Sequence, residues 1–389
     1  MQIFNMGQVP PVTFGAGRIA KVPKIVKNMN GGPVFIIADA ILAQLGVTER
    51  LTQDLADNGI AFELAAEVSG EPKEALVDDL CARVRNAGAR VIVGLGGGAA
   101  MDAAKLVAAI ANANQPAQNF ALAARPLPAN GIPAIAIPTT AGTGSEVTRT
   151  SVISKADGWK TWFWGEELMF SQVVLDPELT LSLPPHLTAW TGIDAVAHAL
   201  EGATVRNASP AGQLYGLEAL RILSEALPRV VADGADLEAR GRVLWASTVA
   251  GLALHNCNTH MGHNISHALG SLVRIHHGLA TGLGLEVSLP WLVARSEGAE
   301  NYGLAAHALG GDATADALPL EFSKLMRVCS IPAELPAECR DINASALAAE
   351  MRNDANIGMA ANAPCQISDS DLDALASLVV AMPHEAAAP

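Results

Sequence analysis

The sequence predicts an α/β N-terminal half, residues 1–183, followed by an all-helical C-terminal half, residues 184–389. In the first half, short apolar runs rich in β-branched residues alternate with segments of helical period. Continuous apolar strands separated by helices indicate a parallel sheet that is covered on both faces. After the stretch SQVVLDPELTLSLPP the pattern becomes helical and rich in Ala and Leu, so we expect the boundary at Pro184–Pro185.

Each element of the first half has its own signal. The run PVFIIAD (33–39) predicts a buried strand, and a helix is expected from about Leu42 to Asn58. The amphipathic stretch KEALVDDLCARVRNAG predicts a helix that ends at Gly88. Two further buried strands are expected in ARVIVGLGGG and IPAIAIPTT, with a helix over residues 100–113 between them.

Composition excludes several classes of function. The net charge of −14 disfavours binding to nucleic acid, whose phosphates require a basic face, and to anionic membranes. No uncharged apolar run reaches the roughly 18 residues of a membrane helix, and no signal peptide is visible. The five cysteines are dispersed without CxxC spacing, which is typical of reduced thiols. We therefore expect a cytoplasmic globular protein.

Two glycine-containing loops are candidate ligand sites. GLGGGAAMDAAK follows a strand and opens a helix, so its backbone N–H groups could approach a phosphate; a plain tight turn is the alternative. It is neither a Walker A loop nor a GxGxxG turn after a first strand. In PTTAGTGSEVT (138–148), hydroxyl side chains follow the next predicted strand: Thr139, Thr140, Thr143 and Ser145. Ligands of open α/β sheets bind at the carboxyl ends of strands, where both loops are expected.

Asp39 is a third candidate, at the end of the first of these strands. A carboxylate in this position can bind a ribose 2′-hydroxyl and repel a 2′-phosphate. It can equally well be the N-cap of the following helix.

The histidines predict a metal site. Six of the chain's 10 histidines fall between residues 255 and 277. His263 and His267 are four residues apart on one predicted helix, Asp194 and His198 are four apart on another, and His277 follows in a loop. One carboxylate and three imidazoles suit Zn²⁺ or Fe²⁺ better than Mg²⁺ or Ca²⁺. The sequence leaves two possible roles for His267, that of a metal ligand and that of a proton-relay group.

The remaining histidines carry no site prediction. His276 is interpreted as a bystander, because adjacent residues such as His276 and His277 point apart. The others are interpreted as ordinary core or surface residues: His186, His255, His260, His307 and His384.

Together the ordered motifs resemble the iron-containing (group III) alcohol dehydrogenases. They are FGAG, GLGGGAAMDAAK, PTTAGTGSE, LDPELT, TGIDAVAHALEG and the run of His263, His267 and His277, and they span about residues 10–280. The resemblance implies the architecture shared with dehydroquinate synthases: an α/β nucleotide-binding domain and a helical metal-binding domain. It also implies an NAD(H)-linked alcohol dehydrogenase or aldehyde reductase with Fe²⁺ or Zn²⁺, with NADP less favoured, in a homodimer or larger oligomer.

The resemblance also assigns roles by position. Asp194, His198, His263 and His277 match the family's metal ligands, and His267 matches a histidine associated with proton transfer. The residues that match cofactor contacts are Asp39, which is associated with NAD preference, Gly96, Gly97, Gly98, Asp102, Thr139, Thr140, Ser145 and Lys160.

The sequence departs from the family at three places. Ala99 stands where the glycine loop usually continues with Ser, and Glu71 stands where Asn is common. The segment DGWKTWFWGEEL (157–168), with Trp159, Trp162 and Trp164, is unlike the usual one and predicts an oligomer contact or local packing.

Other functions remain as alternatives. A glycerol-dehydrogenase-like enzyme has a sparser ligand pattern, and a maleylacetate-reductase-like enzyme works without metal. A sugar-phosphate cyclase needs a basic pocket, and no cluster of Lys or Arg accompanies these histidines beyond Arg274. A metal-storage protein would leave both glycine loops without a role.

Overall fold

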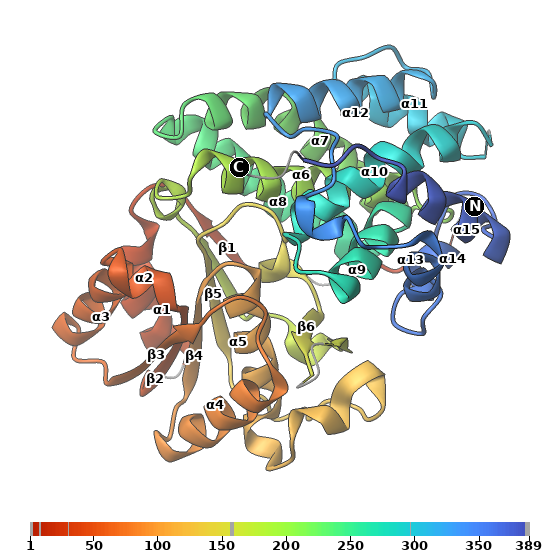
Figure 1. Ribbon diagram of the computed structural model, residues 1–389. Coiled ribbons are helices and arrows are strands. Elements are labelled where there is room, and N and C mark those ends of the chain that lie inside the picture. Colours follow the sequence, from red (N-terminus) through yellow and green to blue (C-terminus); the bar gives the residue numbers. More distant parts are fainter. Residues whose placement is uncertain (1–2, 8, 30, 156–158, 296, 386–389) are drawn as a thin grey trace. The chain divides into compact units, whose positions relative to one another are not determined.

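The structure is a computed structural model that describes residues 3–7, 9–29, 31–155, 159–295 and 297–385 (Figure 1). The chain divides into two compact units. One, which we call the sheet unit, is Gln8–Ser182; the other, the helical unit, combines Met1–Gly7 with Leu183–Pro389. Among the described residues, no helix has both the length and the apolar character that crossing a bilayer requires.

The sheet unit is built on six parallel strands in the order β1-β8-β5-β4-β2-β3. The central strands are apolar and almost completely buried, as the sequence predicts for a parallel sheet covered on both faces. The strands are β1 Val12–Phe14, β2 Val34–Asp39, β3 Phe62–Val68, β4 Val91–Gly96, β5 Ala134–Pro138 and β8 Gln172–Leu175.

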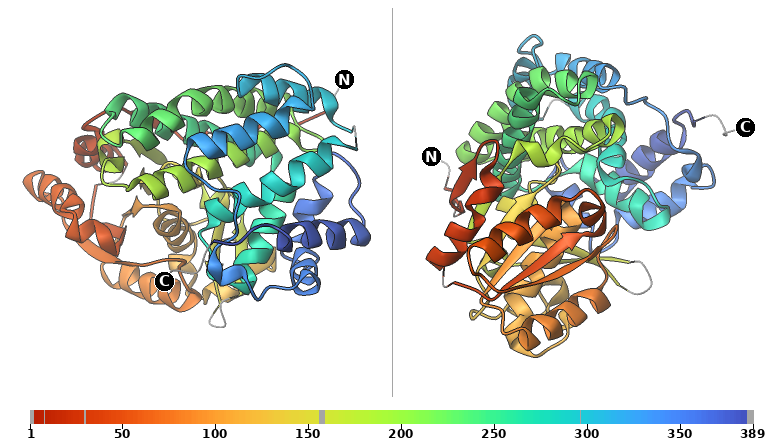
Figure 2. Two further views of the ribbon diagram at one scale, coloured as in Figure 1. Left: turned by 45° about the horizontal axis from the view of Figure 1, so that its top comes forward. Right: turned by 90° about the vertical axis from the view of Figure 1, so that its left-hand side faces the viewer.

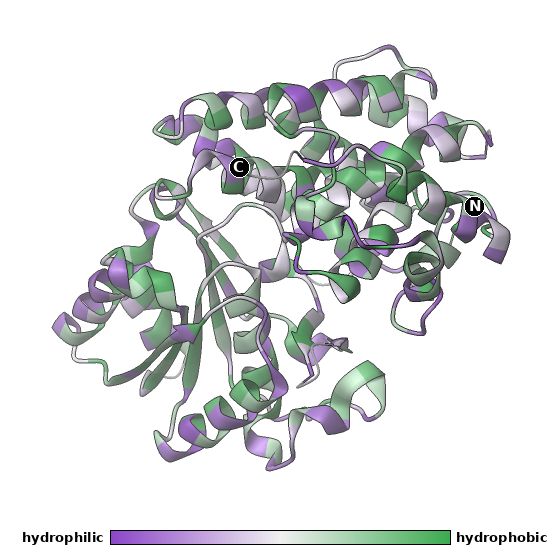
Figure 3. Cartoon of the chain, viewed as in Figure 1, coloured by the Kyte–Doolittle hydropathy of each residue, from purple (hydrophilic) through white to green (hydrophobic). Residues whose placement is uncertain are grey.

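Helices cover both faces of this sheet (Figure 1). On one face the strands pack against residues of α1, α2 and α3, and α4 and α5 lie on the other. Figure 3 shows apolar colouring along the strands and mixed colouring on the outer helices. The helices are α1 Val22–Met29, α2 Ala40–Gln44, α3 Val47–Asp57, α4 Glu74–Asn86 and α5 Gly98–Ile110.

The sheet unit differs from the sequence prediction in detail. The helix expected over 42–58 is two helices, broken at Gly46, whose positive φ of 70° ends α2. A separate antiparallel hairpin, β6 Thr150–Ser154 and β7 Lys160–Trp164, was not predicted. Strands β1, β3 and β8 were not predicted either.

The described part of the helical unit contains helices and no β-ladder longer than a single bridge (Figure 2). Helix α6 packs against α7, α8 and α10, so it is buried on most sides. Its helices are α6 Pro185–Thr204, α7 Pro210–Ala232, α8 Leu237–Cys257, α9 Met261–Leu272, α10 His277–Val293, α11 Ala299–Ala308, α12 Ala317–Val328, α13 Ala344–Met351, α14 Ile357–Ala361 and α15 Asp369–Val380. The predicted fold class is confirmed.

Candidate active site

Three helices of the helical unit bring the predicted metal ligands together. Asp194 and His198 lie one turn apart on α6 and are both buried. His263 is buried in the first turn of α9, and His277 is the first residue of α10. Helical geometry therefore explains the pairing on α6, whereas the meeting of the three helices depends on tertiary packing.

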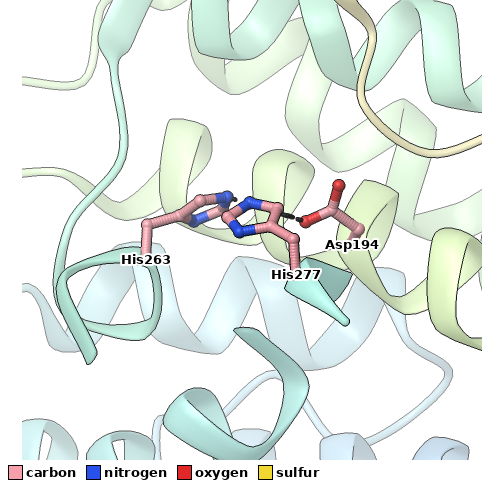
Figure 4. Close-up of side chains that lie close together, drawn as sticks. All are labelled: Asp194, His263 and His277. Atoms are coloured by element: carbon pink, nitrogen blue, oxygen red, sulfur yellow. Dashed lines mark ion pairs between the residues drawn. The ribbon is translucent and has the colours of Figure 1, made fainter. Parts of the chain in front are cut away.

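Asp194, His263 and His277 form a compact group (Figure 4). Asp194 Oδ1 lies 3.8 Å from His263 Nε2 and 3.6 Å from His277 Nε2. The three potential ligand atoms all lie within 4.8 Å of one another, a spacing that one metal ion can bridge.

His198 and His267 flank this group. The His198 ring centroid is 4.5 Å from that of His263, and its Nδ1 is 3.9 Å from Asp194 Oδ2. The half-buried His267 ring is 5.4 Å from the His277 ring and 6.5 Å from the His263 ring. Both histidines therefore lie next to the group of Asp194, His263 and His277 but are not part of it.

Hydrogen bonds orient the two histidines of the group. His263 Nδ1 lies 2.6 Å from Glu201 Oε2 and donates its hydrogen to this carboxylate. The Ser266 hydroxyl donates to the His277 carbonyl oxygen, so its oxygen can accept from His277 Nδ1 at 3.1 Å. With hydrogen on both Nδ1 atoms, both neutral rings present the lone pair of Nε2 toward Asp194.

This donor set fits a divalent metal ion. Among the described residues, neither Asp194 Oδ1 nor His263 Nε2 has a hydrogen-bond partner, although both atoms are buried. When His263 is neutral, these two buried acceptors face each other and repel, and either a metal ion between them or a proton on His263 Nε2 removes the repulsion. A carboxylate oxygen with imidazole nitrogens is a set that both Fe²⁺ and Zn²⁺ accept.

Glu201 shapes the electrostatics of the group and was missed by the sequence analysis. Burial alone raises the pKa of Glu201, but the charges of His260 and His263 and the hydrogen bonds from these residues lower that pKa to about 2. Burial likewise opposes the charged form of His263, yet the charges of Glu201 and Asp194 and the Glu201 hydrogen bond raise the pKa of His263. The TGIDAVAHALEG motif contains Glu201, one turn beyond His198, which was the available signal.

In the sheet unit, the two glycine-containing loops lie side by side. Strand β4 ends at Gly96 and α5 begins at Gly98, so the loop opens a helix as predicted. The Thr139 N–H donates to the Gly96 carbonyl at 2.8 Å, which joins the second loop to the first. A Cβ atom added to Gly97 would meet Thr140, and one added to Gly98 would meet Thr143.

Asp39 contacts the first loop. Its Oδ2 accepts the Gly97 N–H at 2.6 Å, and a Cβ atom at Gly96 would lie 2.4 Å from the same oxygen. Asp39 is the N-cap residue of α2, as the alternative interpretation states, but its side chain accepts no N–H of that helix and is directed to the loop instead. Burial raises the pKa of Asp39, and the hydrogen bond from Gly97 counters only part of this effect.

Asp102 and Ser145 bind each other. The Ser145 hydroxyl donates to Asp102 Oδ1 at 2.5 Å, and Asp102 Oδ2 accepts the Val152 N–H at 2.9 Å. Lys105, which the sequence analysis missed, lies fully buried 3.6 Å from Asp102 Oδ1. Its Nζ donates to both oxygens of Thr148 and to the Thr150 carbonyl. Three accepted hydrogens indicate an ammonium group, so a buried ion pair fixes the second loop.

Lys160 lies on β7 and faces Glu71, with 3.4 Å between Nζ and Oε2. Glu71, which stands where the family commonly has Asn, is thus the ion-pair partner of Lys160, the predicted ribose contact. In the unusual segment, Trp164 is 48% exposed and lies under Arg149, and Lys155 lies over Trp159. Asp157 and Gly158 of this segment are outside the described residues.

Comparison with known proteins decides the family. Residues 10–177 match the family "Iron-containing alcohol dehydrogenase", and residues 188–376 match "Fe-containing alcohol dehydrogenase family, C-terminal". The chain belongs to the iron-containing alcohol dehydrogenase family.

Named relatives of this iron-containing alcohol dehydrogenase agree with the assignment. It is 33% identical to the sulfoacetaldehyde reductase of Bilophila wadsworthia, over 78% of each chain. It is 36% identical to the probable alcohol dehydrogenase EutG of Escherichia coli, over 71% of this chain and 70% of EutG. The structure of sulfoacetaldehyde reductase from Bifidobacterium kashiwanohense in complex with NAD⁺ superposes with a TM-score of 0.88 at 27% identity. This match covers 98% of the present chain and 100% of that chain.

The comparisons confirm the predicted family and its oxidoreductase activity. The roles of individual site residues remain predictions. For this iron-containing alcohol dehydrogenase, the structure shows that Asp194, His263 and His277 meet, that His198 and His267 adjoin them, and that the two loops of the sheet unit are joined.

Proposed function

We propose that the chain is an NAD(H)-dependent alcohol dehydrogenase or aldehyde reductase whose substrate is a primary alcohol, a diol or the matching aldehyde. The observation that carries this proposal is the pair of buried acceptors, Asp194 Oδ1 and His263 Nε2, which face each other beside His277. Such a pair is costly in a protein without a cation and useful in one that holds a metal.

In this proposal Asp194, His198, His263 and His277 hold Fe²⁺ or Zn²⁺, which supplies a Lewis acid for the substrate oxygen. His267 carries the proton that the alcohol releases, because its half-buried ring adjoins His277 at 5.4 Å while lying outside the closest group. A bound nicotinamide cofactor would supply the hydride donor or acceptor for the substrate carbon.

The cofactor side is proposed from the sheet unit. The loop at Gly96, Gly97 and Gly98 binds the pyrophosphate at the start of α5. Because the Gly97 N–H already donates to Asp39, the N–H groups of the first turn of α5 are the donors. Asp39 and Lys160 bind the ribose, and the second loop, with Thr139, Thr140 and Ser145, binds the nicotinamide end. Asp102 acts within this set by holding the Ser145 hydroxyl.

The proposal is tested by pairing metal content with activity. Protein purified without oxygen is analysed for metal, and NAD⁺ reduction is followed with primary alcohols and diols before and after chelation. We expect activity to disappear with the metal and to return with Fe²⁺ or Zn²⁺. Activity that persists in metal-free protein would contradict the proposal and favour a metal-independent, maleylacetate-reductase-like reaction.

Variants separate the proposed ligands from the proton carrier. His198→Ala should lose metal, whereas His267→Ala should keep metal and lose about 10²-fold or more in rate. His307→Ala, which removes an exposed histidine of α11, serves as the control and should behave like the wild type. Metal loss in His267→Ala together with metal retention in His198→Ala would reverse the two roles.

We further propose a homodimer or larger assembly in the cytoplasm. The cytoplasmic location is supported by the five cysteines, which are all buried and form no disulfide bonds. Light scattering of the purified chain would test the assembly, and a monomer at micromolar concentration would contradict it.

A further inference from the structure

Glu201 is a fully buried carboxylate in the last turn of α6, in contact with His263. Its Oε2 accepts the backbone N–H of His260 at 3.0 Å and the ring Nδ1–H of His263 at 2.6 Å. Its Oε1 accepts the backbone N–H of Gly262 at 2.6 Å. Among the described residues, the ring nitrogens that lie nearest to its oxygens belong to these two histidines, so its charge is directed at the start of α9.

The neighbouring His260 is not the ring that donates to Glu201. The Thr204 hydroxyl donates to the Leu200 carbonyl at 2.8 Å, so its oxygen accepts from His260 Nε2 at 3.0 Å. With its hydrogen on Nε2, neutral His260 presents a lone pair at Nδ1, which has no hydrogen-bond partner among the described residues, although it lies 3.3 Å from Glu201 Oε1. His263 is therefore the only one of the two rings that donates a hydrogen bond to the carboxylate.

We propose that Glu201 is a positioning residue that holds His263 with hydrogen on Nδ1, so that the Nε2 lone pair is presented to a metal ion beside Asp194. This inference rests on the proposed function, because it assumes that the group of Asp194, His263 and His277 binds metal. Its physical basis is that a carboxylate which accepts from one imidazole nitrogen fixes which nitrogen of that ring remains an acceptor.

The amide of Gln cannot replace this carboxylate. In Glu201→Gln an NH₂ group takes the place of one of the two oxygens. At the Oε1 position it would meet the Gly262 N–H, donor against donor, at 2.6 Å. At the Oε2 position it would meet the His260 N–H, again donor against donor, and it would face the ring nitrogen of His263. That ring could adapt only by accepting at Nδ1 and moving its hydrogen to Nε2. That hydrogen would point at Asp194 and block metal binding.

Two readouts test the inference. Nitrogen chemical shifts of ¹⁵N-histidine-labelled, metal-free protein at pH 8 show which nitrogen of His263 carries hydrogen, with the signal assigned by its absence in His263→Asn. Titration with Co²⁺ alone, followed by visible absorbance, gives the metal affinity. In the wild type we expect hydrogen on Nδ1. In Glu201→Gln we expect it on Nε2, with Co²⁺ affinity lower by about 10- to 100-fold.

Thr204→Val is the matched control, because it removes the hydrogen-bond acceptor of His260 from the same helix while leaving the hydrogen bonds of Glu201 in place. It should keep the wild-type nitrogen shifts of His263 and the wild-type Co²⁺ affinity. A neutral His263 ring with its only hydrogen on Nε2 in the wild type would overturn the inference, even if Glu201→Gln failed to fold. Equal affinity of wild type and Glu201→Gln would also overturn it. Absence of Co²⁺ binding by the wild type would instead contradict the proposed function, since the shifts are read without metal.

Discussion

The Ser145 hydroxyl lies 2.5 Å from Asp102 Oδ1 and gives its hydrogen to that carboxylate. Both residues were predicted to contact the cofactor, but in the structure they are hydrogen-bonded to each other. If Ser145 also contacts a cofactor, it does so as a hydrogen-bond acceptor, because its single hydrogen is already donated. Asp102 then acts by fixing the loop, together with its buried partner Lys105.

Replacing Asp102 with Asn should destabilise the sheet unit. The change leaves the Lys105 ammonium buried without its carboxylate, and the loss of one partner of a buried ion pair costs about 3 kcal/mol or more. Urea unfolding, followed by circular dichroism, measures the cost.

The double variant Asp102→Asn/Lys105→Met provides the control for that prediction. Because it removes both charges, we expect its loss of unfolding free energy to be smaller than the sum of the two single losses. Additive losses would show that the two groups do not stabilise each other.

The close approach of α10 to α6 predicts a second effect, at Gly278. A Cβ atom there would lie 2.1 Å from the Trp190 carbonyl oxygen and 3.0 Å from Asp194 Cβ, and both are rigid parts of α6. Gly278→Ala should therefore push away the first turn of α10, which carries His277. We expect a loss of about 1–3 kcal/mol in unfolding free energy and weaker Co²⁺ binding.

Gly358→Ala is the matched control for this substitution. Gly358 lies in α14, and outside its own helix no atom of the described residues comes within 4 Å of an added Cβ, so alanine should leave Co²⁺ binding unchanged. It should also stabilise the protein slightly, by up to about 1 kcal/mol, as alanine does in helices. Equal Co²⁺ affinity in Gly278→Ala and wild type would mean that His277 is not held by this contact.

The central strands could be predicted from sequence because each is a short apolar run, whereas β3 could not. Glu63 and Glu67 interrupt its pattern, and they are tolerated because β3 is an edge strand whose carboxylates pair with Arg83 of α4. The edge position is a property of the whole sheet, so no local pattern indicates it.

The candidate site shows the same division between local and tertiary information. The spacing of Asp194 and His198 follows from helical geometry and is readable in the sequence. The bond between Glu201 and His263 joins residues 62 positions apart, and it forms only because α9 starts beside the end of α6. Lys105 was missed for a related reason: lysine is rarely fully buried, and the carbonyls that receive it belong to a loop more than 40 residues away.

Asp39 predicts a pH-dependent stability. Burial raises the pKa of Asp39 above that of the unfolded chain, so the folded protein holds more protons between the two pKa values. The free energy of unfolding therefore falls as pH rises through this interval and stays lowered above it. Asp39→Asn does not titrate, so it should be more stable than the wild type at pH 7.

Melting temperatures of both proteins between pH 4 and pH 7 test this prediction. The advantage of Asp39→Asn should shrink as pH falls through the folded pKa and then the unfolded one. Asp57→Asn, at the exposed end of α3, is the control. A difference that does not change with pH would show that burial of the charge is not the cause.

The ion pair of Glu71 and Lys160 predicts an effect on cofactor choice. Glu71 follows β3, and the last residue of this strand, Val68, pairs with Asp39 at the end of β2. Two carboxylates therefore lie at or just after adjacent strand ends, and Glu71 also balances the charge of Lys160 at 3.4 Å.

If Lys160 contacts the ribose, Glu71→Gln removes a charge that repels a 2′-phosphate and frees a cation that attracts one. We expect kcat/KM with NADP⁺ to rise relative to NAD⁺ by about tenfold, equivalent to about 1.4 kcal/mol. Glu63→Gln, at the opposite end of β3, should leave the ratio unchanged. A ratio unaffected by Glu71→Gln, or raised equally by Glu63→Gln, would remove Glu71 from cofactor selection and leave the preference to Asp39.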